Sequence, residues 1–251
     1  DDGGGADNGC EQQQSAALAA RSQARAELES LFLALYPPEL PEEDGMKTSR
    51  NERLLQGYNN VALTYGETSV TAFSDILVKI QDSYRGLPEK VDGVFYDLGC
   101  GAGKPVFVAA AMHPWHRCIG IEILGDLHRI CLKALQRWEC GLRDTVAVEE
   151  AKGGTAQNVE FVCGDFTVLH WSDGDVVFAN STCFGDDLMK KLAQGAAALK
   201  EGAIVVTTSD PVPSPAFEVL EETVMDQGGR CATTCYIQRR VTKFSATFGA
   251  P

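Results

Sequence analysis

The sequence predicts an α/β fold, in which helices cover both faces of a mostly parallel β-sheet. From residue 93 onwards, short apolar segments alternate with helical segments, and strands that alternate with helices form parallel sheets. A glycine-rich turn joins the first apolar segment to the helical segment that follows it. The chain has 251 residues, of which 44% are hydrophobic. This length suits one large domain with a small accessory element.

The N-terminal part is predicted to be a small helical element. Residues 1–15 are rich in Gly, Asp and Gln and are expected to form a disordered acidic tail. Apolar residues recur at helical spacing over 16–36, and the prolines Pro37 and Pro38 end that helix. The other predicted segments are a polar connector over 38–52, a helix around 53–62 and a helix over 69–84. We therefore expect a tail (1–15), a helical element (16–90) and an α/β domain (91–251).

Seven strands are predicted in the α/β domain. The five apolar strands are expected at 94–98, 118–122, 159–163, 175–179 and 203–208. Helices are expected between them at 105–112, 125–141 and 185–199. Two final segments, 231–238 and 241–248, show an alternation of β-forming residues that predicts an antiparallel hairpin. The prediction is thus a seven-stranded, mostly parallel sheet with an antiparallel hairpin at its C-terminal end.

Charge and cysteine content narrow the classes of function. The formal net charge of −13 does not favour a polyanionic partner, so we expect weak intrinsic nucleic-acid binding. The sequence has no run of about 18 apolar residues, so no membrane span is expected. Nine cysteines without a Cys-x-x-Cys pair suit a reducing compartment, nuclear or cytoplasmic. His113, His116 and Cys118 match no zinc spacing, and no metal is expected.

The turn Asp97–Lys104 is the first candidate ligand site. Its three glycines, Gly99, Gly101 and Gly103, lie between a strand and a helix. Glycine lets the backbone approach a ligand closely, and N–H groups at a helix N-terminus bind carboxylate or phosphate. Gly-x-Gly-x-Gly is also compatible with an ordinary tight turn. The strand before it and the helix after it favour nucleotide binding.

Acidic residues follow the next two predicted strands. Glu122 ends the second strand, where a carboxylate can accept hydrogen bonds from both hydroxyls of a ribose. Asp165 follows the third strand and can accept from an adenine amino group, and the adjacent Phe166 can pack on the ring. The alternatives are a solvent-facing Glu122 and an Asp165 that caps the next turn.

The loop after the fourth strand is the candidate reaction site. Ligands of doubly wound sheets bind at the carboxyl ends of strands near the switch in strand order. Asn180 lies there, and its amide can orient an acceptor nitrogen, although Asn is also a common turn residue. The order of glycine turn, ribose acid, adenine acid and polar loop is that of Rossmann-like class I methyltransferases. Gly-x-Gly-x-Gly, rather than Gly-x-Gly-x-x-Gly, favours S-adenosylmethionine over a dinucleotide.

Over about residues 50–240, the chain resembles the non-SET histone lysine methyltransferases, the disruptor-of-telomeric-silencing family. The strongest match is Tyr65-Gly66-Glu67-Thr68-Ser69, which in that family is a loop over S-adenosylmethionine. The family's Asp-Leu-Gly-Ser-Gly-x-Gly-Gln turn matches Asp97 to Lys104, with Cys100 for Ser and Lys104 for Gln. The cofactor-binding residues implied by the resemblance are Tyr65, Gly66, Glu67, Thr68, Asp97, Gly99, Gly101, Gly103, Lys104, Glu122, Asp165 and Phe166.

The resemblance also extends to the acceptor loop. The family's Val-Asn-Asn-Phe-Ala-Phe-Gly segment aligns with residues 179–185, where Asn180 and Phe184 match. Ser181 and Thr182 replace the second Asn and the first Phe, an aromatic residue that helps to wall the lysine channel in the family. Tyr236 matches a channel aromatic more loosely. The resemblance therefore implies that Asn180, Phe184 and Tyr236 are the catalytic residues.

The expected activity is transfer of a methyl group from S-adenosyl-L-methionine to a lysine amine of a histone, with S-adenosyl-L-homocysteine as product. The resemblance implies a histone or nucleosome as partner. Two alternatives stay open, and the changes at Ser181 and Thr182 support both. One is a methyltransferase that acts on a non-histone protein, a small molecule or a nucleic-acid base. The other is a catalytically silent module that binds the cofactor.

Overall fold

The computed structural model describes residues 7–88, 92–146, 157–227 and 232–241. Its centre is a seven-stranded sheet with the order β3-β2-β1-β4-β5-β7-β6. The first five strands of this order are parallel, and β7 is antiparallel to both β5 and β6. The predicted mixed sheet is therefore confirmed. The strands are β1 (Val94–Leu98), β2 (Arg117–Glu122), β3 (Asn158–Cys163), β4 (Val176–Ala179), β5 (Ile204–Thr208), β6 (Phe217–Asp226) and β7 (Ala232–Arg240).

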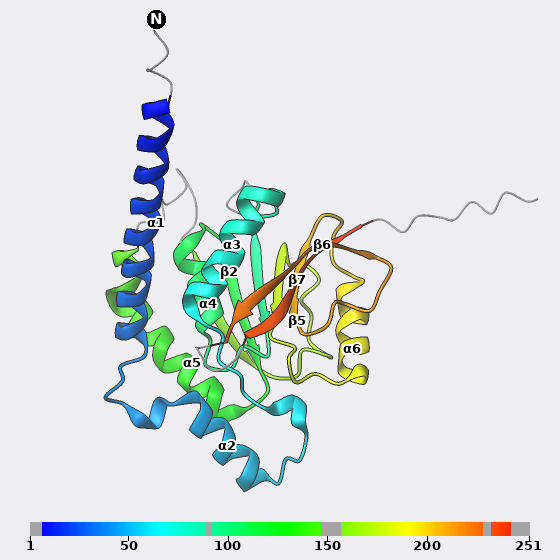
Figure 1. Ribbon diagram of the computed structural model, residues 1–251. Helices are drawn as coiled ribbons and strands as arrows, with labels where there is room; N and C mark the ends of the chain where they lie inside the picture. Colours follow the sequence, from blue (N-terminus) through cyan, green and yellow to red (C-terminus); the bar gives the residue numbers. More distant parts are fainter. Residues whose placement is uncertain (1–6, 89–91, 147–156, 228–231, 242–251) are drawn as a thin grey trace, which may run out of the picture.

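Helices cover both faces of this sheet. Figure 1 shows α1, α3, α4 and α5 along one side of the strands and α6 along the other. Every residue of β1, β4 and β5 is buried, as expected for strands covered on both faces. The helices are α1 (Asp7–Leu35), α2 (Gly45–Gln56), α3 (Val70–Tyr84), α4 (Lys104–Met112), α5 (Gly125–Arg137) and α6 (Asp186–Ala196). No helix in the described ranges combines the length and apolarity needed to cross a membrane.

The order of the strands shows where in the sheet a ligand site is expected. The chain runs outward from β1 to β2 and β3, and then returns to the other side of β1 with β4. The carboxyl ends of β1 and β4 therefore lie side by side where the strand order reverses. In open α/β sheets this switch point is where ligands bind.

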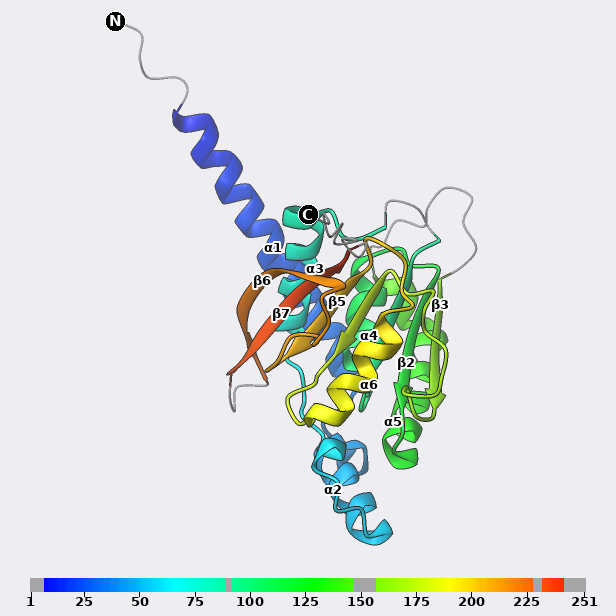
Figure 2. The ribbon, with the colours of Figure 1, turned by 90° about the vertical axis from the view of Figure 1, so that its right-hand side faces the viewer.

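The long helix α1 extends beyond the sheet (Figures 1 and 2). It begins at Asp7, so residues 7–15 are helical and not part of a disordered tail, whereas residues 1–6 lie outside the described residues. Residues 19–27 are exposed, whereas the C-terminal part of the helix buries Leu28, Leu31, Phe32 and Leu35 at helical spacing. The C-terminal end of α1 is therefore packed into the core, whereas residues 19–27 are not.

The next helix differs from its prediction. Neither the connector over 38–52 nor the helix around 53–62 is correct, because α2 spans Gly45–Gln56. The carboxylate Oδ1 of Asp44 accepts hydrogen bonds from the backbone N–H groups of Met46 (3.0 Å) and Lys47 (3.1 Å) and so caps the helix. Gly57, at φ +67°, ends it in the left-handed region. Caps, rather than apolar spacing, define this exposed helix.

The C-terminal hairpin is present, but its predicted strands were displaced along the chain. The segment 231–238 corresponds to β7, whose partner β6 precedes it in the sequence. The segment 241–248 is not that partner: Val241 lies outside the strand, and residues 242–248 lie outside the described residues. Strand β6 is an edge strand with a charged, largely exposed face, so its sequence lacks a strong apolar alternation.

Candidate functional site

The glycine turn after β1 adopts a backbone that only glycine accommodates readily. Gly99, Gly101 and Gly103 have φ values of +77°, +58° and +86°. A Cβ atom on Gly101 would lie 2.2 Å from Cε2 of Tyr65, so the tyrosine ring occupies the space above the turn. The turn is tied to β2, since the N–H groups of Gly99 and Cys100 donate to the carbonyl of Ile121 at 2.8 and 3.0 Å.

Two buried carboxyl groups flank this turn. Oε2 of Glu122 accepts from the N–H of Gly101 (2.7 Å), and Oε1 accepts from the N–H of Leu124 (2.8 Å). Asp97 is 1% exposed, and its Oδ2 has no hydrogen-bond partner within the described part of the chain. Burial, with a smaller contribution from the charge of Glu122, raises the pKa of Asp97 well above its usual range. Burial also raises the pKa of Glu122 to about 7.

These carboxyl groups fit an adenosyl amino acid. A carboxylate oxygen can accept two hydrogen bonds, so both oxygens of Glu122 can still accept from ribose hydroxyls. A buried oxygen without a donor is costly, and the ammonium group of the amino acid would supply one to Asp97. The predicted residues Asp97 and Glu122 therefore lie together and have the acceptor capacity that S-adenosylmethionine requires.

The loop 65–69 rests on the same turn. The Tyr65 ring lies against Gly101, and Glu67 forms an ion pair with Lys104 at the start of α4. Lys104 also lies 5.1 Å from the centre of the Tyr36 ring, and burial lowers its pKa. The structure thus brings together predicted residues that lie on either side of β1 in the sequence.

The strand-end residues Asp165 and Phe166 lie near Phe184. Oδ1 of Asp165 accepts from the N–H of Thr167 (2.8 Å), so Asp165 does cap the following turn. The rings of Phe166 and Phe184 stack, with centroids 5.8 Å apart and planes at 20°. Phe184 also approaches the turn, since a Cβ on Gly99 would lie 3.9 Å from its Cζ. Phe184 therefore lies on the side of the predicted adenosyl pocket.

Asn180, after β4, connects to the loop 65–69. Its Nδ2 donates to the carbonyl oxygen of Gly66 (3.1 Å) and to Oγ1 of Thr68 (3.3 Å). Its Oδ1 accepts from three side chains: Thr182 (2.9 Å), Thr208 (3.0 Å) and Gln227 (3.2 Å). We call Asn180, Thr182, Thr208 and Gln227 the Asn180 cluster.

Of this cluster, the sequence predicted only Asn180 as a site residue: Thr182 was marked as a departure from the family pattern, and Thr208 and Gln227 were not expected in the site. Thr208 ends β5, so its position at a carboxyl strand end was a usable signal. Gln227 follows β6, a strand that was not predicted, and nothing in the local sequence marks it. Ser181 is structural: its Oγ donates to the carbonyl of Thr208 (2.7 Å) and accepts from the Thr208 N–H (3.0 Å).

The structure does not bring Tyr236 to the Asn180 cluster. In the sheet Tyr236 is paired with Thr207, whereas the neighbouring Cys235 is paired with Thr208. Paired residues share a face of the sheet, and successive residues alternate. The side chain of Tyr236 therefore lies on the face opposite to that of Thr208.

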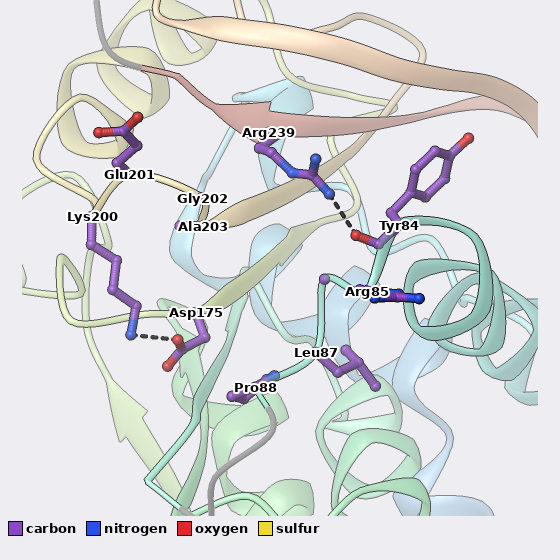
Figure 3. Close-up of a pocket in the computed structure, with 11 residues that line it drawn as sticks. Tyr84, Arg85, Leu87, Pro88, Asp175, Lys200, Glu201, Gly202, Ala203 and Arg239 are labelled. Atoms are coloured by element: carbon purple, nitrogen blue, oxygen red, sulfur yellow. Dashed lines mark hydrogen bonds and ion pairs between the residues drawn. The ribbon is translucent and has the colours of Figure 1, made fainter.

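A cavity of about 490 Å³ lies at the other end of the sheet (Figure 3). Its lining includes Asp175 and Ala203, which immediately precede β4 and β5. Three of its charged groups have partners in the protein: Lys200 pairs with Asp175, and Nη2 of Arg239 donates to the carbonyl of Tyr84 (2.6 Å). This cavity is separate from the glycine turn and contains none of the predicted site residues.

His113 and Cys118, which were considered as metal ligands in the sequence, have other surroundings in the structure. The His113 ring lies edge-on to Trp115, with centroids 4.7 Å apart, and burial lowers the pKa of His113. Cys118 is buried in the core. Among the residues that the structure describes, no group of three or more His, Cys, Asp or Glu side chains could hold a metal ion.

A solved methyltransferase structure shares the fold of this chain. No curated protein sequence matches the chain. A solved structure of the rRNA methyltransferase aviRa from Streptomyces viridochromogenes matches with a TM-score of 0.51 and 17% identity, covering 72% of this chain and 90% of that chain. TrmN from Thermus thermophilus matches with a TM-score of 0.47 and 16% identity, covering 67% and 48% of the two chains. At such low identity, the likeness to aviRa shows the fold alone.

The comparison with protein families identifies the family of the chain. The sequence profile described as "Histone methylation protein DOT1" matches residues 47–234. This range contains the loop 65–69, the glycine turn, Glu122, Asp165 and the Asn180 cluster. Because the match covers well over half of the chain, the chain belongs to the DOT1 family and is an S-adenosylmethionine-dependent histone methyltransferase.

Proposed function

We propose that the carboxyl ends of β1 and β4 form the active site, where a histone lysine amine receives the methyl group. One observation carries this proposal. The loop 65–69 contacts the glycine turn through Tyr65 and Glu67, and it contacts the acceptor loop through Gly66 and Asn180. A single segment therefore adjoins both the predicted cofactor pocket and the predicted acceptor side.

The cofactor would be held by acidic side chains at successive strand ends. Asp97 would accept from the ammonium group, Glu122 from the ribose hydroxyls, and Asp165 from the adenine amino group, with Phe166 packed on the ring. When bound, S-adenosylmethionine supplies an electrophilic methyl group on a sulfonium and leaves as S-adenosylhomocysteine. The buried, unpartnered Oδ2 of Asp97 supports this assignment.

The acceptor side positions an amine rather than deprotonating it. The Asn180 cluster consists of amide and hydroxyl side chains and contains no carboxylate or imidazole. A lysine amine attacks only when neutral, and its pKa of about 10.4 falls when the group is desolvated. We expect the proton to leave to solvent before transfer, while Asn180, whose amide bonds to Gly66 and Thr68, keeps the cofactor loop and the acceptor loop in place around the amine. Phe184 and Tyr236 have no part in this cluster, so their predicted catalytic roles rest on the resemblance.

Charge supports a histone partner. The net charge of −13 attracts the basic segments of histones and repels nucleic acid. We therefore propose a nuclear protein that acts on chromatin and depends little on DNA contacts of its own. The attraction to histones should weaken as salt is raised.

The test is an acceptor panel with isotopically labelled cofactor. The chain would be incubated with free histones, nucleosomes, RNA and a pool of small metabolites. The proposal expects label on lysine side chains of histones, and an Asn180→Ala variant should lose most of it. Label on RNA or on a metabolite, with none on histone lysines, would refute the proposed acceptor. Absence of label on every acceptor, with cofactor bound, would favour the silent binding module.

A further inference from the structure

Gln227 joins three segments that are distant in the sequence. Its side-chain Nε2 donates to Oδ1 of Asn180 (3.2 Å) and to Oγ1 of Thr182 (2.9 Å). Its Oε1 lies against the loop 65–69, since a Cβ on Gly66 would be 3.4 Å from this oxygen. Gln227 is 7% exposed. The β6–β7 hairpin thus contacts the cofactor loop and the acceptor loop through one side chain.

The donors around Asn180 fix the orientation of its amide. Thr182 has a single hydroxyl hydrogen, which it donates to Oδ1 of Asn180, and its oxygen accepts from Gln227. Gln227 and Thr208 supply further donors to the same Oδ1. An Asn180 amide turned by half a rotation would set its NH₂ group against these donors. The cluster therefore keeps Nδ2 directed at Gly66.

Thr182 is essential to this arrangement. The matching family residue is Phe, whose ring can neither donate to Asn180 nor accept from Gln227. In this chain Thr182 does both. Thr182, which stands where the family has Phe, is thus matched by Gln227. The two residues form one hydrogen-bonded chain that ends on Asn180.

We infer that Gln227 is a positioning residue for methyl transfer: it holds the Asn180 amide so that the cofactor loop and the acceptor loop are ordered together. The positioning itself follows from the hydrogen bonds, and its effect on turnover rests on the proposed function. Gln227 acts through Asn180 and Thr182, and no direct contact with the acceptor is required.

The matched variants are Gln227→Met and Gln157→Met. Met has a similar length and no N–H donor. Gln157 is a control because its Nε2 donates to the carbonyl of His113 (3.1 Å), in a segment away from the cluster. A third variant, Thr182→Val, keeps the shape of the exposed Thr182 side chain and removes one link of the chain.

The first measurement is the ¹⁵N order parameter of the Asn180 side-chain amide in the cofactor-free protein. We expect a rigid amide in wild type and in Gln157→Met, and a value below about 0.6 in Gln227→Met and in Thr182→Val. Values equal to wild type in both cluster variants would overturn the inference. This result is independent of whether the protein binds cofactor or methylates histones.

The second measurement is the steady-state rate of histone methylation. We expect kcat to fall about tenfold in Gln227→Met, the effect of losing one or two uncharged hydrogen bonds. KM for the histone should change less than about twofold, because Gln227 holds Asn180 rather than the acceptor. An equal loss of kcat in Gln157→Met, or a loss confined to KM, would contradict a positioning role.

Discussion

At the scale of single residues, the site depends on polar groups held where water does not reach them. Glu122 and Asp97 are 5% and 1% exposed, and burial raises the pKa of both carboxyl groups. Such groups disfavour the folded state when they ionise, and a ligand that donates hydrogen bonds offsets this cost. The carboxyl pair at the glycine turn therefore links cofactor binding to stability.

Glu122→Gln should change how stability depends on pH. In the unfolded chain Glu122 ionises near pH 4.5, and in the folded chain only near pH 7. Between these values the folded state holds the extra proton, so the contribution of Glu122 to stability falls as pH rises. Relative to the variant, wild type should lose on the order of 3 kcal/mol from pH 4.5 to 7. Denaturant unfolding of the cofactor-free proteins measures this, and parallel pH profiles would contradict it.

Gly101→Ala tests the packing of Tyr65 on the turn. The matched control is Gly57→Ala, because Gly57 has a similar φ of +67° and no atom within 4 Å of a Cβ at that position. The control should cost only the left-handed backbone penalty, roughly 1–2 kcal/mol. Gly101→Ala should cost about 1–3 kcal/mol more, since its Cβ displaces the Tyr65 ring. Equal free energies of unfolding for the two variants would show that the ring does not rest there.

Residues whose roles follow from the local chain could be predicted. Glu122 and Asp165 could be predicted because they lie at the carboxyl ends of two strands, and Gly101 because a turn between strand and helix needs glycine. Gln227 could not be predicted as a site residue, because it lies beside Asn180 only in the folded hairpin. Tyr236 was placed by resemblance, and strand alternation puts it on the other face of the sheet from Thr208.

At the scale of elements, buried strands could be predicted from their apolar sequence, whereas an exposed strand could not. The strands β1, β4 and β5 are buried throughout and consist mostly of apolar residues, so their sequence predicted them closely. The edge strand β6 carries charged, exposed residues and was missed, which displaced the predicted hairpin. Helix α2 was misplaced because its ends depend on Asp44 and Gly57 rather than on an apolar face.

The N-terminal element is fastened to α5 by a buried ion pair. Arg137 donates two hydrogen bonds to the Glu43 carboxylate, at 2.7 and 2.8 Å, and the Glu43 side chain is 4% exposed. Arg137→Ala would leave this carboxylate with Lys133 (3.3 Å) and should destabilise the fold by about 3 kcal/mol.

The exposed pair Arg25–Asp75, between α1 and α3, provides the control. Both side chains are more than half exposed, so Arg25→Ala should lower the free energy of unfolding far less than Arg137→Ala does. Thermal or denaturant unfolding measures both variants. A similar, small cost for Arg137→Ala would mean that the buried pair does not hold the element in place.

At the scale of the whole molecule, the two ends of the sheet have different chemistry. The carboxyl ends carry the glycine turn, two buried carboxyl groups and the Asn180 cluster. The amino ends carry a cavity in which Lys200 pairs with Asp175 and Arg239 donates to a backbone carbonyl. The central claim is that S-adenosylmethionine binds at the carboxyl ends, where the chain runs from strand to helix at the switch point.

Calorimetric titration with S-adenosylhomocysteine tests this claim most directly, with three proteins compared: wild type, Glu122→Ala, and Lys200→Ala in the cavity at the other end of the sheet. Wild type and Lys200→Ala should bind alike. Glu122→Ala should bind about 10- to 100-fold more weakly, which corresponds to roughly 1–3 kcal/mol for unpaired polar groups. Absence of binding to wild type at millimolar ligand, or an affinity that changes with Lys200 and not with Glu122, would contradict the account.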